Sequence, residues 1–326
     1  MLPSALWRRP ASDRIKRFLV NLLCLFVPSK KYRELIRHYF MTPRICLGRP
    51  LLPIKKRSQP INIAFCFNGH LARQFGVTIA SLLANSKNRA KYNIYCVVDD
   101  SVTPEMRNML TSMVKTWDQD SSLIFLEANH DFDRCPTRHA TAAPYYRLML
   151  PVLLPELDEV IYADVDMIFC RDLIELAEFD LGDHLLAGVQ ERSDGYINSG
   201  LMVMNLAGLR REGIYETWPE IRCQKDFPNE LHDQDLLNIT CRGRILYLPV
   251  KYNFWPTLYY LFYKRGGITP QDQHELKYNV VIVHYNTSKP WREKKRCFMS
   301  WLWWEYARLT PFYEDLLAEL KSGSSA

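Results

Sequence analysis

Two aspartates separated by one residue, Asp164 and Asp166, follow directly after the apolar run at residues 160–163. A short run of β-branched and aromatic residues predicts a buried strand, and α/β sheets bind their ligands at the carboxyl ends of such strands. Carboxylates in this position can bind a hard divalent cation, which in turn neutralises a diphosphate. The alternative interpretation is a solvated turn after the strand, and the triplet alone does not choose between the two.

His284 is the candidate for a third metal ligand. It closes the apolar stretch 279–284, which predicts another strand, and Lys289 follows five residues later. Beside an acidic pair, an imidazole can complete a metal site, and the lysine could then contact a phosphate. The alternative for His284 is a hydrogen-bonded structural histidine at a strand end.

Two polar clusters could hold a substrate. Asp233 and Gln234 begin the helix-like stretch 232–238, and Asn198 lies in the segment 197–200 before an apolar run. The acids of a first helical turn can instead complement the helix dipole, and asparagine with glycine can simply form a turn. We expect Asp233 and Gln234 to face a cleft and bind a polar group.

These side chains need a scaffold, and the pattern of apolar runs predicts one. Strand-like and helix-like stretches alternate along the chain, which indicates an α/β fold with a mostly parallel sheet covered on both faces. The predicted strands are residues 61–67, 93–98, 123–126, 160–163, 184–190, 200–205, 244–248 and 279–284. The predicted helices before the second half of the sheet are residues 76–84, 104–116 and 145–153.

Charge is distributed unevenly along the 326 residues. Residues 1–60 carry 14 Lys and Arg against 2 Asp and Glu, a net of +12, whereas the whole chain has +6, so the remainder has −6. An acidic body argues against nucleic acid as a partner, and a basic tail favours an anionic membrane surface. The nine cysteines are scattered without a C-x-x-C pair, which is typical of a reducing compartment.

Both ends of the chain raise the question of a membrane. Residues 18–27 are too short to span a bilayer, for which about 20 apolar residues are needed. They favour a helix in the membrane plane, the alternatives being a helix packed on the main domain or a signal anchor. The basic and aromatic stretch 294–306 fits either a helix at a lipid interface or a helix that closes over the core.

Five motifs, taken in order, resemble glycosyltransferase family 8, and within it the bacterial lipopolysaccharide core glucosyl- and galactosyltransferases. The resemblance covers about residues 61–291. The motifs are Tyr145-Tyr146-Arg147-Leu148, Tyr162-Ala163-Asp164-Val165-Asp166, Asn198-Ser199-Gly200, Asp233-Gln234-Asp235-Leu236-Leu237-Asn238, and His284 with Lys289-Pro290-Trp291.

The resemblance implies a GT-A-type nucleotide-binding domain at residues 60–291, with basic helical extensions at residues 1–59 and 292–326. It implies retaining transfer of an α-linked hexose from UDP-glucose or UDP-galactose to a lipopolysaccharide-core or similar cell-surface glycan, with Mn²⁺ or Mg²⁺ as cofactor. An enzyme of this kind would attach peripherally to the inner face of the bacterial cytoplasmic membrane. The implied metal ligands are Asp164, Asp166 and His284, and Lys289 would contact the diphosphate. Arg147 matches a basic position near the donor phosphates or sugar. Asn198, Asp233 and Gln234 match positions that line the donor-sugar and acceptor pocket, and Asp233 and Gln234 are also the catalytic candidates.

Two departures from the family pattern leave a rival reading open. Asn68 follows the first strand where an acidic residue near the uridine is usual, and the segment 284–289 is shortened and lacks a glycine. An amide can still hydrogen-bond uracil or ribose, so Asn68 remains a candidate donor contact. The rival is a catalytically impaired UDP-sugar-binding protein that acts as a scaffold. Two other rivals are disfavoured. A Golgi enzyme of the same family would need a membrane-spanning anchor, and a nucleotidyltransferase would need a glycine-rich phosphate loop near the first strand; neither pattern is seen in the sequence.

Overall fold

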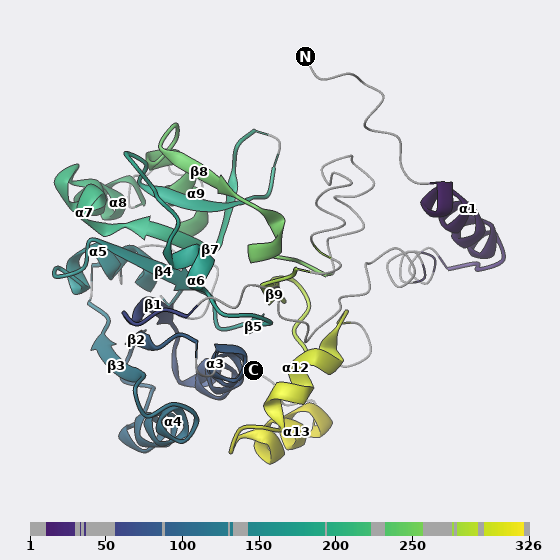
Figure 1. The fold of residues 1–326 in the computed structure, drawn as a ribbon, viewed down its shortest axis with the longest axis horizontal. Helices are drawn as coiled ribbons and strands as arrows, with labels where there is room; N and C mark the ends of the chain where they lie inside the picture. Colours follow the sequence, from purple (N-terminus) through teal and green to yellow (C-terminus); the bar gives the residue numbers. More distant parts are fainter. Residues whose placement is uncertain are drawn as a thin grey trace.

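The centre of the molecule is a sheet of seven strands in the order β3-β2-β1-β4-β7-β6-β8 (Figure 1). The computed structural model describes residues 11–29, 33, 36, 56–86, 89–129, 131–132, 143–192, 194–222, 232–256, 276, 279–292 and 297–322. The strands of the sheet are β1 (Ile61–Cys66), β2 (Tyr92–Val98), β3 (Ser122–Glu127), β4 (Glu159–Ala163), β6 (Leu186–Gln190), β7 (Ile197–Asn205) and β8 (Ile245–Leu248).

Most neighbouring strands in this sheet are parallel. β1 is parallel to β2 and β4, β2 to β3, and β6 to β8, whereas β7 is antiparallel to both β4 and β6. In chain order, β2 and β3 lie on one side of β1, and the next strand of this sheet, β4, lies on its other side. The strand order therefore reverses between β1 and β4, where α/β sheets bind ligands. The predicted α/β class with a mostly parallel sheet is confirmed.

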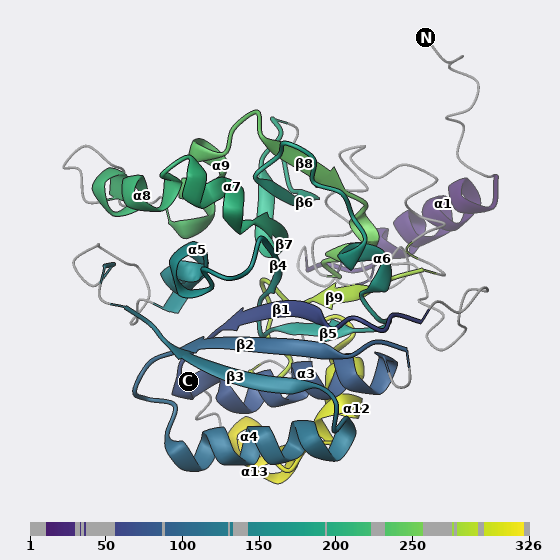
Figure 2. The same ribbon diagram turned by 60° about the vertical axis from the view of Figure 1, so that its left-hand side comes forward.

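Helices cover both faces of the sheet, as Figure 2 shows. Along β1, Ile61, Ile63 and Phe65 belong to one buried cluster, and Ala64 and Cys66 to the other. This alternation is expected for a strand with both faces buried. The first cluster includes residues of α3 (Ala72–Ser86) and α4 (Pro104–Trp117), and the second includes η3 (Ala143–Met149), α5 (Leu150–Leu153), α7 (Leu206–Arg211), α8 (Ile214–Arg222) and α9 (Asp233–Thr240).

Two short strands form a separate sheet. β5 (Met167–Phe169) pairs antiparallel with β9 (Ile282–His284), and Met167 lies opposite His284. β9 lies within the strand predicted at residues 279–284, whereas β5 and its pairing with β9 were not predicted. The remaining short elements are η2 (Gly69–Leu71), α6 (Ile174–Ala177) and η4 (Val250–Tyr252). β5 and β9 bring together parts of the chain more than a hundred residues apart, which positions the site described below.

Two predicted elements differ in detail from the structure. The helix predicted at residues 145–153 is the 3₁₀ helix η3 followed by one turn of α-helix, α5. Pro151 lies inside the predicted helix and lacks the N–H group that a continuous α-helix would use there. The strand predicted at residues 200–205 is β7, which begins at Ile197, so Asn198 lies inside a strand and not in a turn.

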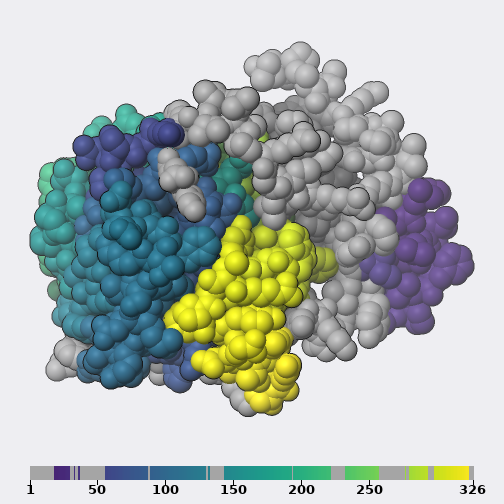
Figure 3. Space-filling model, turned by 60° about the horizontal axis from the view of Figure 1, so that its bottom comes forward, coloured from purple at the N-terminus to yellow at the C-terminus, as the bar shows by residue number. Residues whose placement is uncertain are grey.

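The carboxy-terminal helices pack on the main domain. α12 (Ser300–Ala307) contacts α3, and Figure 3 shows α12 and α13 (Tyr313–Ser322) in yellow against the blue first part of the fold. Trp303 and Trp304 are buried, while Trp301 is 56% exposed. Gly76 on α3 leaves room for the Phe312 ring, since a Cβ at Gly76 would lie 2.5 Å from it. Trp303 and Trp304 therefore pack over the core, as in the second of the two interpretations of this stretch, and do not form a lipid-facing helix surface.

The helix α1 (Ala11–Leu25) lies at the periphery in Figures 1 and 2. Its side chains at residues 18–25 are described, and of these only Val20 and Cys24 are buried. In the described part of the chain, no helix is long and apolar enough to cross a membrane.

Candidate active site

The two aspartates lie on the turn that leads from β4 to β5. The backbone N–H of Asp164 donates to the carbonyl of Gly200 on β7 (2.8 Å), which continues the β4–β7 pairing by one residue. The Thr78 hydroxyl on α3 lies 2.6 Å from the carbonyl oxygen of Val165 and 3.0 Å from that of Met167. These contacts hold the turn at the carboxyl end of β4, beside the point where the strand order reverses.

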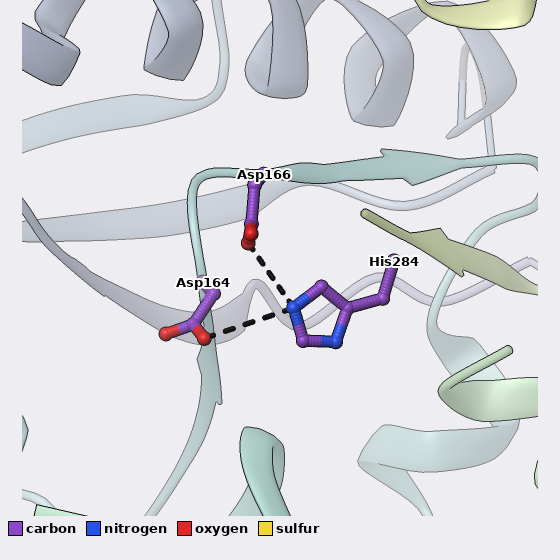
Figure 4. Close-up of side chains that lie close together, drawn as sticks. All are labelled: Asp164, Asp166 and His284. Carbon is purple, nitrogen blue, oxygen red and sulfur yellow. Dashed lines mark ion pairs between the residues drawn. The ribbon is translucent and has the colours of Figure 1, made fainter. Parts of the chain in front are cut away.

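His284 faces both carboxylates (Figure 4). Its Nε2 lies 3.2 Å from Oδ1 of Asp166 and 3.8 Å from Oδ2 of Asp164. One ligand atom from each of the three residues lies within 4.8 Å of the others. The β5–β9 pairing produces this geometry, because it places Met167, the residue after Asp166, opposite His284. The Tyr285 N–H continues the pairing by donating to the Asp166 carbonyl (2.9 Å).

The donor atoms of this triad fit a divalent cation. Asp166 Oδ1 is buried and accepts no hydrogen bond from the described residues, and a buried oxygen in that condition is costly unless a cation binds it. Burial alone would raise the pKa of Asp166, but the adjacent Lys289 ammonium outweighs burial and lowers it below its ordinary value, so the carboxylate is ionised at neutral pH. Two hard oxygens and one imidazole nitrogen suit Mn²⁺ or Mg²⁺.

Arg147 lies buried between two carboxylates. Its Nη2 is 3.0 Å from Asp164 Oδ1 and its Nε is 3.1 Å from Asp233 Oδ2. Nη1 donates to the Ser199 carbonyl and hydroxyl oxygens, both at 2.9 Å, and the guanidinium lies 4.7 Å from the centre of the Tyr162 ring. Desolvation opposes the charge of Arg147, but the surrounding acids outweigh it and raise its pKa. Arg147 therefore orients the two acids.

The amino-terminal turn of α9 supplies the next two residues. Gln234 Oε1 accepts from the Ser199 backbone N–H (2.9 Å), and its Nε2 donates to Glu191 Oε2 (3.2 Å). Burial raises the pKa of Asp233, and Arg147 partly offsets this rise. Asp233 is buried and Gln234 is half-buried, and both contact residues of the same network; that they hold a polar group stays a prediction.

Glu191 is a site residue that sequence analysis missed. It directly follows β6, and its Oε2 accepts from Asn198 Nδ2 (3.1 Å) as well as from Gln234. A carboxylate placed immediately after a strand is the same signal that singled out Asp164. Asn253 was missed as well: it is fully buried and lies between Asn198 and His284, and no pattern in its own sequence neighbourhood indicated this.

Lys289 lies on the segment that follows β9. Its ammonium group contacts Asp166 Oδ2 and donates to the carbonyls of Tyr285 (2.9 Å) and Asn286 (3.4 Å). Asn68 lies at the carboxyl end of β1, next to β4 in the sheet, and is buried. The turn after it packs closely, because the Gly69 N–H donates to the Ser101 hydroxyl (2.7 Å).

Comparison with known proteins assigns this chain to a family. The model of glycosyl transferase family 8 matches residues 62–295, well over half of the chain. The chain belongs to glycosyl transferase family 8. The resemblance inferred from the five motifs is thereby confirmed.

The relatives of this family 8 glycosyltransferase are distant. The lipopolysaccharide 1,2-glucosyltransferase of Escherichia coli (strain K12) is 26% identical over 260 residues, which cover 72% of this chain and 74% of that protein. General stress protein A of Bacillus subtilis (strain 168) is 23% identical over 278 residues, 76% of this chain and 96% of that one. The galactosyltransferase LgtC, solved in complex with donor and acceptor sugar analogs, has a TM-score of 0.65 at 23% identity, covering 77% of this chain and 96% of LgtC. The likeness to LgtC confirms the GT-A-type fold.

In this family 8 enzyme the predicted residues form a continuous network of contacts. It runs from Lys289 through Asp166, His284 and Asp164 to Arg147. From Arg147 it continues through Ser199 to Gln234, Glu191 and Asn198. The structure brings together Arg147, Asp164, Asp166, Asn198, Asp233, Gln234, His284 and Lys289, and it places Asn68 at the neighbouring strand end. Their individual roles remain predictions.

Proposed function

We propose that this glycosyltransferase moves an α-linked hexose, with retention of configuration, from UDP-glucose or UDP-galactose to a lipopolysaccharide-core or similar cell-surface glycan. The observation that carries the proposal is the cluster of Asp164, Asp166 and His284 at the reversal point of the sheet. The names of two relatives, a lipopolysaccharide glucosyltransferase and a galactosyltransferase, support a hexose donor and a glycan acceptor.

The charges around the cluster suit departure of a nucleoside diphosphate. Asp164, Asp166 and His284 would hold a Mn²⁺ or Mg²⁺ ion, whose charge stabilises a diphosphate leaving group. Lys289 already lies against Asp166, so its ammonium can be shared with a phosphate oxygen bound beside that carboxylate. Arg147 contributes indirectly, because it holds Asp164 in place.

The sugar-binding side of the site is formed by Gln234, Asp233 and Glu191. Glycosyl transfer develops positive charge on the sugar ring, and polar or anionic groups stabilise it where it develops. Gln234 is positioned by the Ser199 N–H and by Glu191, so it is preorganised for this contact. Asn68, at the end of β1, is the candidate contact to the uridine.

The test is UDP release by the purified protein from UDP-glucose and from UDP-galactose, each with and without Mn²⁺. Metal-dependent release that Asp166→Ala abolishes would support the proposal and identify the donor. Binding of UDP and Mn²⁺ without release, even with oligosaccharide acceptors, would favour the rival of a catalytically impaired scaffold. Absence of binding to either ligand would contradict the transferase proposal.

We further propose that the enzyme attaches peripherally to the inner face of the bacterial cytoplasmic membrane through α1. Six large apolar side chains on α1 and just after it are 44–81% exposed: Phe18, Leu19, Leu22, Leu23, Leu25 and Phe26. The segment that contains them carries the net charge of +12 counted over residues 1–60. An apolar helix face within a basic segment fits an anionic lipid surface.

Sedimentation with lipid vesicles tests this attachment. We expect binding to phosphatidylglycerol vesicles, weaker binding to phosphatidylcholine vesicles, and loss of binding when Phe18→Ser and Leu22→Ser are combined. Met109→Ser is the matched control, because Met109 is an exposed apolar residue (43%) on α4, away from α1. Equal binding by the α1 variant and the wild type would overturn the assignment to α1.

A further inference from the structure

A buried asparagine contacts the side of His284 that faces away from the carboxylates. Asn253 is fully buried, and its Oδ1 lies 2.8 Å from His284 Nδ1. The backbone around it is paired to β9, since the Phe254 N–H donates to the Ile282 carbonyl (3.1 Å) and the His284 N–H to the Phe254 carbonyl (2.8 Å). The distance between the Asn253 amide and the imidazole is therefore set by backbone pairing.

The orientation of the Asn253 amide follows from its other neighbours. Asn198 Nδ2 faces the Glu191 carboxylate (3.1 Å), which can only accept, and Asn198 Oδ1 faces the Gly200 backbone N–H (3.0 Å), which can only donate. Asn198 therefore has one possible orientation. Its Oδ1 also accepts from Asn253 Nδ2 at 2.9 Å, so the oxygen of Asn253 must point toward His284.

This orientation determines where the imidazole carries a proton. An amide oxygen 2.8 Å from Nδ1 is stabilised only when Nδ1 bears a hydrogen, because two lone pairs at that distance repel. We propose that Asn253 is a positioning residue that keeps the His284 proton on Nδ1 and so directs the Nε2 lone pair to the metal. The proposal rests on the proposed metal role of His284. The amide orientation behind it depends on Glu191, Asn198 and Gly200.

The indole of Trp255 defines the competing arrangement. Its Nε1 lies 3.2 Å from His284 Nδ1, and an indole N–H can only donate. If Trp255 donated to Nδ1, that nitrogen would carry no hydrogen and the ring proton would be on Nε2, where it would block a metal. The shorter contact to Asn253 favours a hydrogen on Nδ1, and the two arrangements predict opposite results.

The tautomer can be read directly from the protein without metal. With histidine ring nitrogens labelled with ¹⁵N and the signals of residue 284 assigned by comparison with His284→Gln, we expect Nδ1 to be protonated in the wild type. An unprotonated Nδ1 in the wild type would overturn the proposal. This measurement needs no folded variant at position 253.

Metal affinity in matched variants provides the second measurement. We expect Asn253→Ala to weaken Mn²⁺ binding, measured by electron paramagnetic resonance, by about 10- to 100-fold, the usual effect of removing a partner of a metal-ligating histidine. Trp255→Phe should leave Mn²⁺ affinity and the Nδ1 proton unchanged. The reverse pattern, with Trp255→Phe weakening binding and a folded Asn253→Ala not, would contradict the proposal. If His284→Gln itself binds Mn²⁺ as the wild type does, the proposed metal role fails and with it the role of Asn253 toward the metal, whereas the tautomer measurement separately decides whether the proton is on Nδ1.

Discussion

Gly200→Ala should displace His284 or Asp164 and so weaken metal binding at the proposed site, because the new methyl group would occupy the space beside both side chains. A Cβ at position 200 would lie 2.4 Å from His284 Cε1 and 2.9 Å from Asp164 Oδ2. Carbon atoms in contact are normally about 3.5–4.0 Å apart, so the imidazole or β7 must move by about 1 Å. His284 is 98% buried and its Nδ1 lies 2.8 Å from Asn253, and a movement of that size would break this hydrogen bond.

The expected result is a folded protein with a weakened metal site. Overpacking of this kind costs about 1–3 kcal/mol of stability, which a domain of ordinary stability tolerates. Mn²⁺ affinity should fall by about 10- to 100-fold, equivalent to about 1.4–2.7 kcal/mol. Mn²⁺ binding without donor, measured by electron paramagnetic resonance, together with urea unfolding separates the two effects.

Gly188→Ala is the matched control for this prediction. Gly188 lies on β6 of the same sheet, and its Cβ would lie 2.6 Å from Ile197 Cδ1, so the substitution overpacks the domain without contacting the triad. It should lower stability similarly and leave Mn²⁺ affinity unchanged. If Gly200→Ala bound Mn²⁺ as the wild type does, the proposed position of the metal between His284 and Asp164 would be refuted.

Three further predictions address charges in the site. Arg147→Met removes the partner of the buried Asp233 carboxylate and of the partly exposed Asp164 carboxylate and should lower the urea-unfolding free energy by about 3–5 kcal/mol; a loss near zero would contradict the buried pairing of Arg147 with Asp233. Burial alone would raise the pKa of Asp166, but the Lys289 ammonium outweighs burial and lowers the pKa below its ordinary value. The Asp166–Lys289 pair therefore stabilises the fold above about pH 4 and loses this effect only as the pH falls through the lowered pKa. The stability difference between the wild type and Asp166→Asn, which has no titrating group at position 166, should therefore be constant from about pH 7 to 5, and a change within that range in a urea series would disprove the sign. Glu191→Gln retains a carbonyl oxygen toward Gln234 but removes a charge, and it should lower kcat by about 10²-fold with unchanged Mn²⁺ affinity; unchanged kcat would exclude an electrostatic role.

The sequence predicted the parts of the site that follow directly from strand patterns. Asp164 and Asp166 come after an apolar run that forms β4, and His284 ends the run that forms β9. Local apolar patterns indicate where a strand ends, whereas the β5–β9 pairing that brings these two strand ends together was not predicted. The family motifs then indicated that these residues act as one site.

Contacts that depend on pairing over long sequence distances could not be predicted in this way. Asn253 contacts Asn198, 55 residues earlier, and His284, 31 residues later, and its own neighbourhood resembles any loop. β5 has only three residues, too few to show a period. The pattern of tryptophans in α12 predicted a lipid-facing helix and a core-facing helix equally well. The core-facing arrangement depends on contacts with α3, which α12 packs against and where Gly76 also leaves space for Phe312.

Anomalous diffraction from crystals of the protein soaked with Mn²⁺ and UDP would locate the manganese ion independently of activity. We expect one strong peak within bonding distance of Asp164, Asp166 and His284 Nε2, with UDP phosphate oxygens completing the coordination. A peak elsewhere, or UDP bound at the reversal point of the sheet with no manganese at these three residues, would contradict the proposed metal site.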